Sequence, residues 1–387
     1  MPDILPDATD PVALTRALIR CPSVTPAAGG ALTLLEQVLT PLGFTVHRMT
    51  MTEPGTPDVE NLYARIGTVG DNLCFAGHTD VVPPGDESAW SSPPFAAHIE
   101  DGHVIGRGAV DMKGAIACFV AAVARKIKRT GGIGDCSLSL LITGDEEGPS
   151  INGTVKVLDW LRARGERIDA CIVGEPSNPS ALGDEIKIGR RGSLNAELIV
   201  HGRQGHAAYP ELAENPVPKL VRLLDRLAHA RLDDGNAHFQ RSNLEVTVVT
   251  VPNTATNVIP AEARARFNVR YNDHWTRPRL EAFVLAICDD AAPEIDARYS
   301  LTFSGTGDVF LTQPGPLVDR MVAAVKSVTG RTPRLTTGGG TSDARFIQAV
   351  CPVIEFGLVN ATIHQVDERV AIADLEQLTE IYGWMIR

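Results

Sequence analysis

Short apolar runs typical of buried strands alternate with helical patterns along the first part of the chain. Ser137–Thr143 and Ala170–Val173 are predicted as buried strands, and residues 155–164 between them as a helix. A longer helix is predicted from about Met112 to the glycine pair at 131 and 132. Strands that alternate with helices predict an α/β fold with a mostly parallel central sheet and helices on both faces.

The alternation of buried strands with helices ends after Gly192 and resumes after about Gly305. In between, the predicted order is strand, helix, two strands, helix and strand, at residues 193–201, 215–228, 244–251, 263–271, 277–288 and 299–303. This βαββαβ order is the split unit of ferredoxin-like folds. We therefore expect a large α/β domain in two parts, residues 1–191 and 305–387, interrupted by a small domain at residues 192–304.

Overall charge, apolar runs and cysteine pattern indicate which partners and which cellular location to expect. Asp plus Glu is 47 and Lys plus Arg is 36, so the net charge is −11 and neither nucleic acid nor an anionic membrane is expected as partner. The longest uncharged apolar run, residues 115–124, is shorter than the ~18 residues of a membrane span. The acidic N-terminus lacks the basic start of a signal peptide. The seven cysteines form no CxxC pair, which favours free thiols, and we expect a cytoplasmic protein.

Residue types that bind metal ions recur at the ends of strand-like runs. They are His78, Asp111, Glu147, Glu175 and His364, and most have a glycine close by. Active sites of open α/β sheets lie beyond the carboxyl ends of the strands, so these ends are expected to converge on one crevice. Two histidines and three carboxylates suit zinc or a similar divalent ion, and they suffice for two ions if Asp111 bridges.

Two further carboxylates near these positions are left without a metal. Glu146, beside Glu147, is placed to act as a general base. Asp80, two residues after His78, is placed to accept the other ring N–H of that histidine. Taken singly, an Asp-Glu-Glu turn, a His-x-Asp turn or a Glu-Pro loop is more often plain structure. Five such coincidences at strand ends favour a functional site.

Three segments resemble the M20 metallopeptidase and deacylase family. They are CFAGHTDVV at 74–82, GRGAVDMKG at 106–114 and TGDEEG at 143–148. The resemblance covers nearly the whole chain and implies that the inserted domain is a dimerisation or lid domain. It implies two Zn²⁺ ions per subunit, which Co²⁺ can replace. His78 and Glu175 would hold one ion and Glu147 and His364 the other.

The resemblance further implies that Asp111 bridges the ions and is followed by a cis peptide. Glu146 would serve as general base and acid, and Asp80 would orient His78. His206, in the segment GHAAYP at 205–210, would act in trans across a homodimer by stabilising the oxyanion. The substrate contacts that it favours are Arg190, Ser193, Asn257, Arg270, Thr337, Gly338 and Asn360.

Three less specific segments indicate one substrate within the family. They are GRRGS at 189–193, TGGGTSDARF at 337–346 and the segment from Phe356 to Gln365. They imply hydrolysis of N-succinyl-LL-2,6-diaminopimelate to succinate and LL-2,6-diaminopimelate in lysine biosynthesis. The alternatives are acetylornithine deacetylation, hydrolysis of N-acyl amino acids or dipeptides, and a non-catalytic zinc- or peptide-binding module. A binding module has no need of an unliganded Glu146, which argues for an enzyme.

Overall fold

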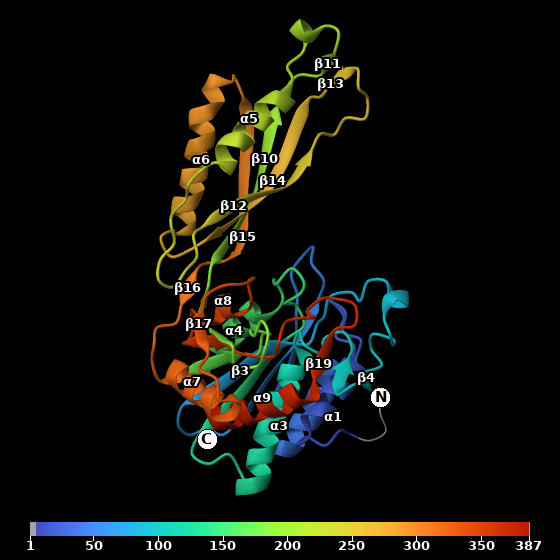
Figure 1. The fold of residues 1–387 in the computed structure, drawn as a ribbon, viewed down its shortest axis with the longest axis vertical. Helices are drawn as coiled ribbons and strands as arrows, with labels where there is room; N and C mark the ends of the chain where they lie inside the picture. The colour runs from blue at the N-terminus through green and yellow to red at the C-terminus, as the bar shows by residue number, and fades with distance from the viewer. Residues whose placement is uncertain (1–4, 387) are drawn as a thin grey trace. The chain divides into compact units, whose positions relative to one another are not determined.

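The computed structural model describes residues 5–386 and divides the chain into two compact units. The first unit holds the chain up to Ile188, Thr312–Thr336 and the chain from Ser342, and the second holds Gly189–Leu311 and Thr337–Thr341. Each unit has its own sheet and its own helices (Figure 1). Within residues 5–386, no helix is long and apolar enough to cross a membrane.

The first unit is built on a mixed sheet of eight strands. Their order is β1 (Thr45–Met51), β2 (Val59–Ile66), β6 (Ser137–Thr143), β3 (Asn72–His78), β7 (Ala170–Val173), β18 (Val353–Glu355), β8 (Glu185–Lys187) and β17 (Arg334–Thr336). The central strands β6, β3, β7 and β18 run parallel to one another. Their carboxyl ends therefore point to one edge of the sheet, as the predicted α/β fold requires.

Helices cover this sheet, as predicted. They are α1 (Pro11–Ile19), α2 (Ala31–Leu39), α3 (Lys113–Thr130), α4 (Thr154–Ala163), α7 (Pro316–Thr329), α8 (Ala344–Ile347) and α9 (Ile372–Met385). Helices α1, α3 and α9 pack together, and α4 packs on β2 and β6. The core between α3, α9 and the sheet is aromatic, because Phe119 stacks on Phe75 at 4.6 Å between ring centroids and Tyr382 meets both rings edge-on. Asp10 caps α1 and Pro11 occupies its first turn.

A separate three-stranded sheet corrects one expectation. It consists of β4 (His98–Glu100), β5 (His103–Ile105) and β19 (Arg369–Ala371), all antiparallel. The sequence predicts Asp111 at the end of a strand-like run that meets the others at the edge of the central sheet. The strand before it instead ends at Ile105 and pairs in this small sheet. Asp111 is therefore carried by a turn before α3 and not by a strand end of the central sheet.

The second unit has the predicted ferredoxin-like order. Its elements are β10 (Gly192–His201), α5 (Pro216–Ala228), β12 (Asn243–Thr250), β14 (Glu262–Tyr271), α6 (Arg277–Glu294) and β15 (Arg298–Gly307). The antiparallel sheet has the order β12-β14-β10-β15. Alternation places Leu194, Leu198 and Val200 of β10 in a core with Leu223 of α5 and Val284 of α6.

Two short pairs extend the second unit at its ends. One joins β9 (Gly189–Arg190) to β16 (Phe310–Leu311), and the other joins β11 (Gly205–His206) to β13 (Val258–Ile259). Within this unit they lie at opposite ends of the four-stranded sheet (Figure 1). Residues carried by the two pairs are therefore far apart in the same unit.

Candidate metal centre and active site

The first unit brings the five candidate ligands together. His78 is the last residue of β3, and Glu147 and Glu175 lie in the loops that follow β6 and β7. His364 lies in the loop after β18, and Asp111 lies in the turn before α3. Ligand atoms of His78, Asp111 and Glu147 all lie within 4.8 Å of one another, so they are close enough to share an ion.

Asp111 lies between the two histidines. Its Oδ1 is 3.0 Å from Nε2 of His78, and its Oδ2 is 3.2 Å from Nε2 of His364. His364 Nε2 is also 2.8 Å from Glu147 Oε1, and His78 Nε2 is 3.8 Å from Glu175 Oε1. Each oxygen of Asp111 thus faces a different histidine, and each histidine lies near a different glutamate, which is the arrangement expected around a bridging carboxylate.

The crowding of carboxylates shifts the pKa values of Glu175, His364 and His78. Burial raises the pKa of Glu175 well above its usual value, and the nearby Asp111 and Glu146 carboxylates raise it further. Hydrogen bonds to Asp111 and Glu147 raise the pKa of His364 to about 10. Burial lowers the pKa of His78, but Asp111, Asp80 and Glu175 together raise it well above its ordinary value. A site this rich in negative charge favours bound cations.

Glu146 lies beside these ligands. Burial raises its pKa to about 8, His78 lowers it, and the Asp343, Asp111 and Glu147 carboxylates raise it. A carboxylate oxygen of Glu146 lies within 4.8 Å of ligand atoms of His78 and Glu175. By distance alone Glu146 could therefore also act as a ligand.

Asp80 has two sets of contacts. Its main-chain oxygen lies 2.9 Å from Nδ1 of His78, while its carboxylate Oδ1 lies 3.6 Å from the same nitrogen. The carboxylate accepts hydrogen bonds from the backbone N–H groups of Glu146 at 3.3 Å and Glu147 at 3.0 Å. Asp80 therefore contacts the His78 ring through its backbone and the Glu146–Glu147 loop through its side chain.

A cis peptide joins Asp111 to Met112, as the resemblance implies. Asn360, an expected substrate contact, lies near the loop that carries Glu175. Its backbone N–H donates to Asn178 at 2.8 Å, and its side chain donates to the carbonyl of Pro176 at 3.5 Å. Asn360 is thus the one expected substrate contact that the first unit contains.

Five of the other expected substrate contacts lie toward one end of the second unit. Arg190 Nη1 donates to the carbonyls of Gly338 at 3.2 Å and Gly340 at 2.9 Å, and Thr337 belongs to the same turn. Ser193 of β10 is paired directly with Arg270 of β14. Two arginines therefore stand near a glycine-rich turn and a serine hydroxyl.

His206 and Asn257 lie at the other end of the second unit. The N–H of Ala207 donates to the carbonyl of Asn257 at 2.9 Å, and the His206 ring accepts from the N–H of Ala208 at 3.0 Å. Both residues are exposed. The stretch of β10 from Ser193 to His201 lies between them and Ser193, which is a span of roughly 26 Å for an extended strand. One copy of this unit does not bring His206 to the Arg190 group.

Comparison with known proteins identifies the family. The sequence pattern of Peptidase family M20/M25/M40 matches residues 74–387. The chain belongs to this family. It is 60% identical over 379 residues to a succinyl-diaminopimelate desuccinylase from Methylobacterium nodulans. The matched residues cover 98% of this chain and 96% of that protein. The M20 resemblance expected from the sequence is confirmed, and the chain is a metal-dependent amide hydrolase.

Solved structures with low sequence identity share the fold. An M20 family metallo-carboxypeptidase from Sulfolobus solfataricus is 17% identical, with a TM-score of 0.78 and coverage of 97% of this chain and 98% of that one. A dinuclear metal-binding M20 peptidase from Bacillus subtilis is 13% identical, with a TM-score of 0.72 and coverage of 98% and 97%. These similarities confirm the predicted fold class.

The residues of this M20 chain fit a divalent metal centre. Oε1 of Glu175 is buried without a hydrogen-bond partner, although it lies 3.8 Å from Nε2 of His78. A buried, unpartnered carboxylate oxygen is costly unless a cation binds it. Imidazole and carboxylate donors are those that zinc-like ions take.

Sequence reasoning missed two buried charges behind the centre. Arg107 and Glu368 form an ion pair of 2.8 Å and are 2% and 0% exposed. Glu368 follows His364 by four residues, and Arg107 precedes Asp111 by four. Nothing in that spacing distinguishes them from surface charges, because their partners are more than 250 residues away in the chain.

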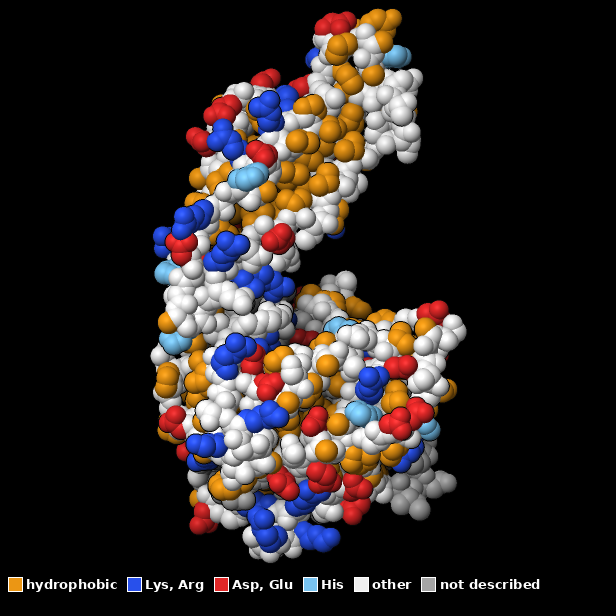
Figure 2. Space-filling model, in the orientation of Figure 1, with side chains coloured by type: hydrophobic (Ala, Val, Ile, Leu, Met, Phe, Trp, Pro, Cys, Tyr) orange, Lys and Arg blue, Asp and Glu red, His pale blue; other side chains and the backbone are white. Residues whose placement is uncertain are grey.

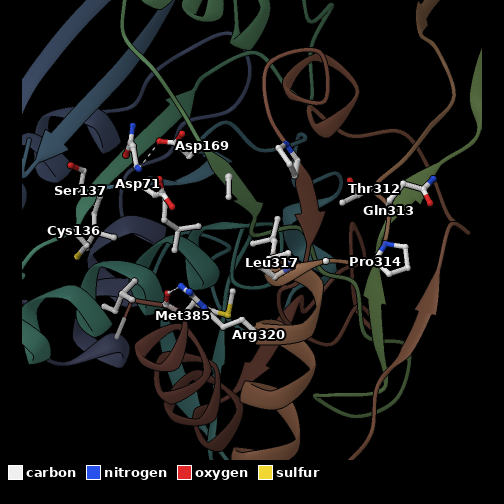
Figure 3. Close-up of a pocket in the computed structure, with 18 of the residues that line it drawn as sticks. Asp71, Cys136, Ser137, Asp169, Thr312, Gln313, Pro314, Leu317, Arg320 and Met385 are labelled. Atoms are coloured by element: carbon white, nitrogen blue, oxygen red, sulfur yellow. Dashed lines mark hydrogen bonds between the residues drawn. The ribbon is translucent and has the colours of Figure 1, made fainter. Parts of the chain in front are cut away.

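A cavity of about 610 Å³ lies at the opposite edge of the central sheet. The residues at the amino ends of β3, β6 and β7 line it, together with Leu317 and Arg320 of α7 and Met385 at the end of α9 (Figure 3). Asp71, Asp169 and Thr312 also face it. None of the candidate ligands is among its lining residues, so this cavity is separate from the metal centre.

Proposed function

We propose that this chain hydrolyses N-succinyl-LL-2,6-diaminopimelate to succinate and LL-2,6-diaminopimelate, a step of lysine biosynthesis. The observation that carries the proposal is the 60% identity, over 98% of the chain, to a succinyl-diaminopimelate desuccinylase. The convergence of His78, Asp111, Glu147, Glu175 and His364 in the first unit supports it.

Two Zn²⁺ ions are proposed for the centre. His78 and Glu175 would hold one, Glu147 and His364 the other, and Asp111 both. This division follows the contacts of the two Asp111 oxygens, each of which faces one of the histidines. When bound, such ions acidify a water molecule and polarise the substrate carbonyl.

Glu146 is proposed to move the proton. Its carboxylate would take a proton from the attacking water and later give it to the leaving amine, as the bond from carbonyl carbon to nitrogen breaks. Glu146 is assigned as base and not as ligand because the five other residues already complete the set for two ions. The Asp80 carboxylate supports this role, since it holds the backbone N–H groups of both Glu146 and Glu147.

The substrate carries three carboxylates, which the second unit is suited to receive. Arg190 and Arg270 are proposed to pair with them, because a guanidinium binds a carboxylate through two parallel hydrogen bonds. Ser193, Thr337, Gly338 and Asn360 are proposed to add further polar contacts, and Asn257, which lies beside His206 at the other end of the unit, is proposed to add one in the partner's site. The backbone of the glycine-rich turn at 338–340 already contacts Arg190, which places it beside this group.

We propose a homodimer in which His206 completes the active site of the partner subunit. The exposure of His206, and its distance from the Arg190 group within one unit, support a role in trans. Strand β12 is at the edge of its sheet and exposes Val248 at 44% and Val249 at 58%. Figure 2 shows hydrophobic side chains gathered along this unit on the face in view. An apolar edge strand favours pairing with a second copy.

Location and domain boundaries belong to the same proposal. All seven cysteines, each within the described residues, are free, which supports a reducing compartment such as the cytoplasm.

The catalytic domain is proposed to comprise residues 1–191 and 305–387, with the dimerisation domain at 192–304.

The deciding experiment compares substrates. Purified chain with two equivalents of zinc is assayed for kcat/KM on N-succinyl-LL-2,6-diaminopimelate, N-acetylornithine and a set of dipeptides. A preference for the succinylated substrate is expected. A preference for N-acetylornithine or a dipeptide would replace the substrate, and no hydrolysis at all with two metal ions bound would favour the binding module.

A further inference from the structure

Glu368 is a buried carboxylate that grips the loop before Asp111. It is 0% exposed. Its Oε1 accepts hydrogen bonds from the N–H groups of Val110 at 2.8 Å and Asp111 at 3.1 Å. Its Oε2 accepts from the N–H of Gly108 at 3.0 Å and from Nη1 of Arg107 at 2.8 Å. Four donors thus converge on one side chain, and three of them are backbone groups of the segment that ends in the bridging residue.

Arg107 connects the same loop to the one that carries His364. Besides its ion pair with Glu368, its Nη1 donates to the carbonyl of Gln365 at 3.2 Å and its Nη2 to that of His364 at 3.4 Å. The guanidinium also lies over the ring of Trp90, 5.1 Å from its centroid. A planar fork with five N–H groups can serve these acceptors together, which an ammonium cannot.

The His364 loop has a backbone that depends on such contacts. His364 has φ of 60° and Asp367 has φ of 56°, a left-handed conformation that residues other than glycine rarely adopt. Asp367 Oδ1 accepts from the N–H and hydroxyl of Ser91 at 2.8 and 3.0 Å. Hydrogen bonds therefore hold this short segment in place, at its start through Arg107 and at its end through Asp367 and Glu368.

We propose that Arg107 and Glu368 form a latch that sets the spacing between Asp111 and His364 and so positions the metal centre. Both act through ligands and are positioning residues. The inference rests on the proposed dinuclear centre, since it explains how two loops far apart in sequence present ligands 3.2 Å apart. Partners that orient metal ligands commonly contribute 10- to 100-fold to metal affinity.

The test measures metal binding and uses Glu368→Gln. The amide keeps the shape of the side chain but replaces one acceptor oxygen by a donor, which then faces N–H groups. Metal-stripped full-length protein is titrated with Zn²⁺ and Co²⁺ by calorimetry, and the visible spectrum of the Co²⁺ form is recorded. We expect affinity to fall about 10- to 100-fold and the spectrum to change.

Two further variants make the test selective. Arg107→Lys keeps the charge but cannot reach Glu368 and the two carbonyls at once, so it is expected to weaken metal binding in the same direction. Glu376→Gln is the matched control, because Glu376 of α9 pairs with Arg125 of α3 at 2.8 Å and not with a residue of either ligand loop. Its metal affinity and spectrum are expected to equal those of the wild type.

A structural role alone would lower the melting temperature and leave affinity and spectrum unchanged, and that result would overturn the latch. If Glu368→Gln does not fold, Arg107→Lys decides by the same two readouts. Failure of the proposed function has a different signature. Wild-type protein would then bind two ions tightly but leave the succinylated substrate intact, and the metal titrations would still decide on the latch.

Discussion

Glu146 and Glu147 are neighbours in the chain but have different surroundings. Glu147 Oε1 lies 2.8 Å from Nε2 of His364, close enough for the two groups to hold one ion. The pKa of Glu146 is raised to about 8, first by burial, which places it close to the neutral range in which a general base is most useful. Bound cations would lower that pKa and increase the fraction of carboxylate. At the scale of single residues, environment separates the proposed base from the proposed ligand.

Glu146→Gln tests this division of roles. The amide cannot accept the proton, so kcat is expected to fall by a factor of about 100 to 10,000. Metal content, measured by atomic emission, is expected to stay at two ions per chain. Glu53→Gln is the control, since Glu53 lies far along the chain and its carboxylate pairs with Lys156 on the surface. Full turnover in Glu146→Gln, or loss of an ion, would contradict the assignment.

Elements meet closely behind the centre, where the segments after β7 and β18 touch. A Cβ on Gly357 would lie 2.3 Å from the carbonyl oxygen of Gly174 and 2.5 Å from that of Glu175. Both neighbours are backbone, so the segment that carries Glu175 must shift in Gly357→Ala. We expect the free energy of unfolding, measured with urea, to fall by about 1–3 kcal/mol, and zinc affinity to fall as well. In the control Gly383→Ala, on α9, the added methyl meets no atom within 4 Å, and stability is expected to be kept or raised.

In the second unit, Asp233 holds the loop between α5 and β12. Its Oδ1 accepts from the N–H groups of Gly235 and Ser242 and from the side chain of Asn272, and its Oδ2 accepts from Nε1 of Trp275 at 3.0 Å. Burial raises the pKa of Asp233, but hydrogen bonds from Ser242, Asn272 and Gly235 lower it overall to about 2. A lowered pKa contributes stability that is complete above about pH 4 and is lost as pH falls toward 2.

Asp233→Asn is therefore expected to lower stability in a pH-dependent way. The deficit against wild type, about 2 kcal/mol for hydrogen bonds to a charged group, is expected at pH 6 and should shrink as pH falls to 2. Chemical unfolding across this pH range measures it. Asp234→Asn, an exposed neighbour that pairs with Arg231, is the control. A deficit of equal size at every pH would show that shape and not charge matters.

Elements with strong local patterns were predictable from the sequence, and those made by distant partners were not. Ser137–Thr143 and Ala170–Val173 have the predicted bounds, because their apolar patterns are local. Strands such as β5 and β19 are three residues long and pair across more than 260 positions. The same reason hides Glu368, whose acceptor role becomes visible only when the two loops are seen together.

At the scale of the whole molecule, the net charge of −11 says little about the proposed substrate. A surplus of acid disfavours a nucleic-acid partner, yet the proposed substrate is itself an anion. Part of the acidic surplus is the cluster of Asp111, Glu146, Glu147 and Glu175, which two divalent cations would nearly neutralise. Binding of an anionic substrate therefore depends on the local charge left after the metal ions are bound and not on the total.

The homodimer is tested by mixing two inactive variants. If His206 acts in the partner's site, a mixed dimer of His206→Ala and Glu146→Gln contains one complete site. Random exchange at equal amounts is then expected to restore about one quarter of wild-type activity, since half of the dimers are mixed and each has one working site out of two. Activity after unfolding and refolding together measures this, and mass spectrometry of differently tagged chains verifies exchange.

A second mixture separates this sharing from simple mutual stabilisation. Glu146→Gln and Glu147→Gln change neighbouring residues that serve one site, so their mixed dimer contains no complete site and is expected to stay inactive. If exchange only stabilised the chains, it would raise the activity of both mixtures alike. If verified exchange leaves the His206→Ala mixture inactive too, His206 does not complete the partner's site. Recovery in the first mixture alone requires His206 and Glu146 to meet across two copies of the chain, which agrees with the exposed position of His206 on its unit.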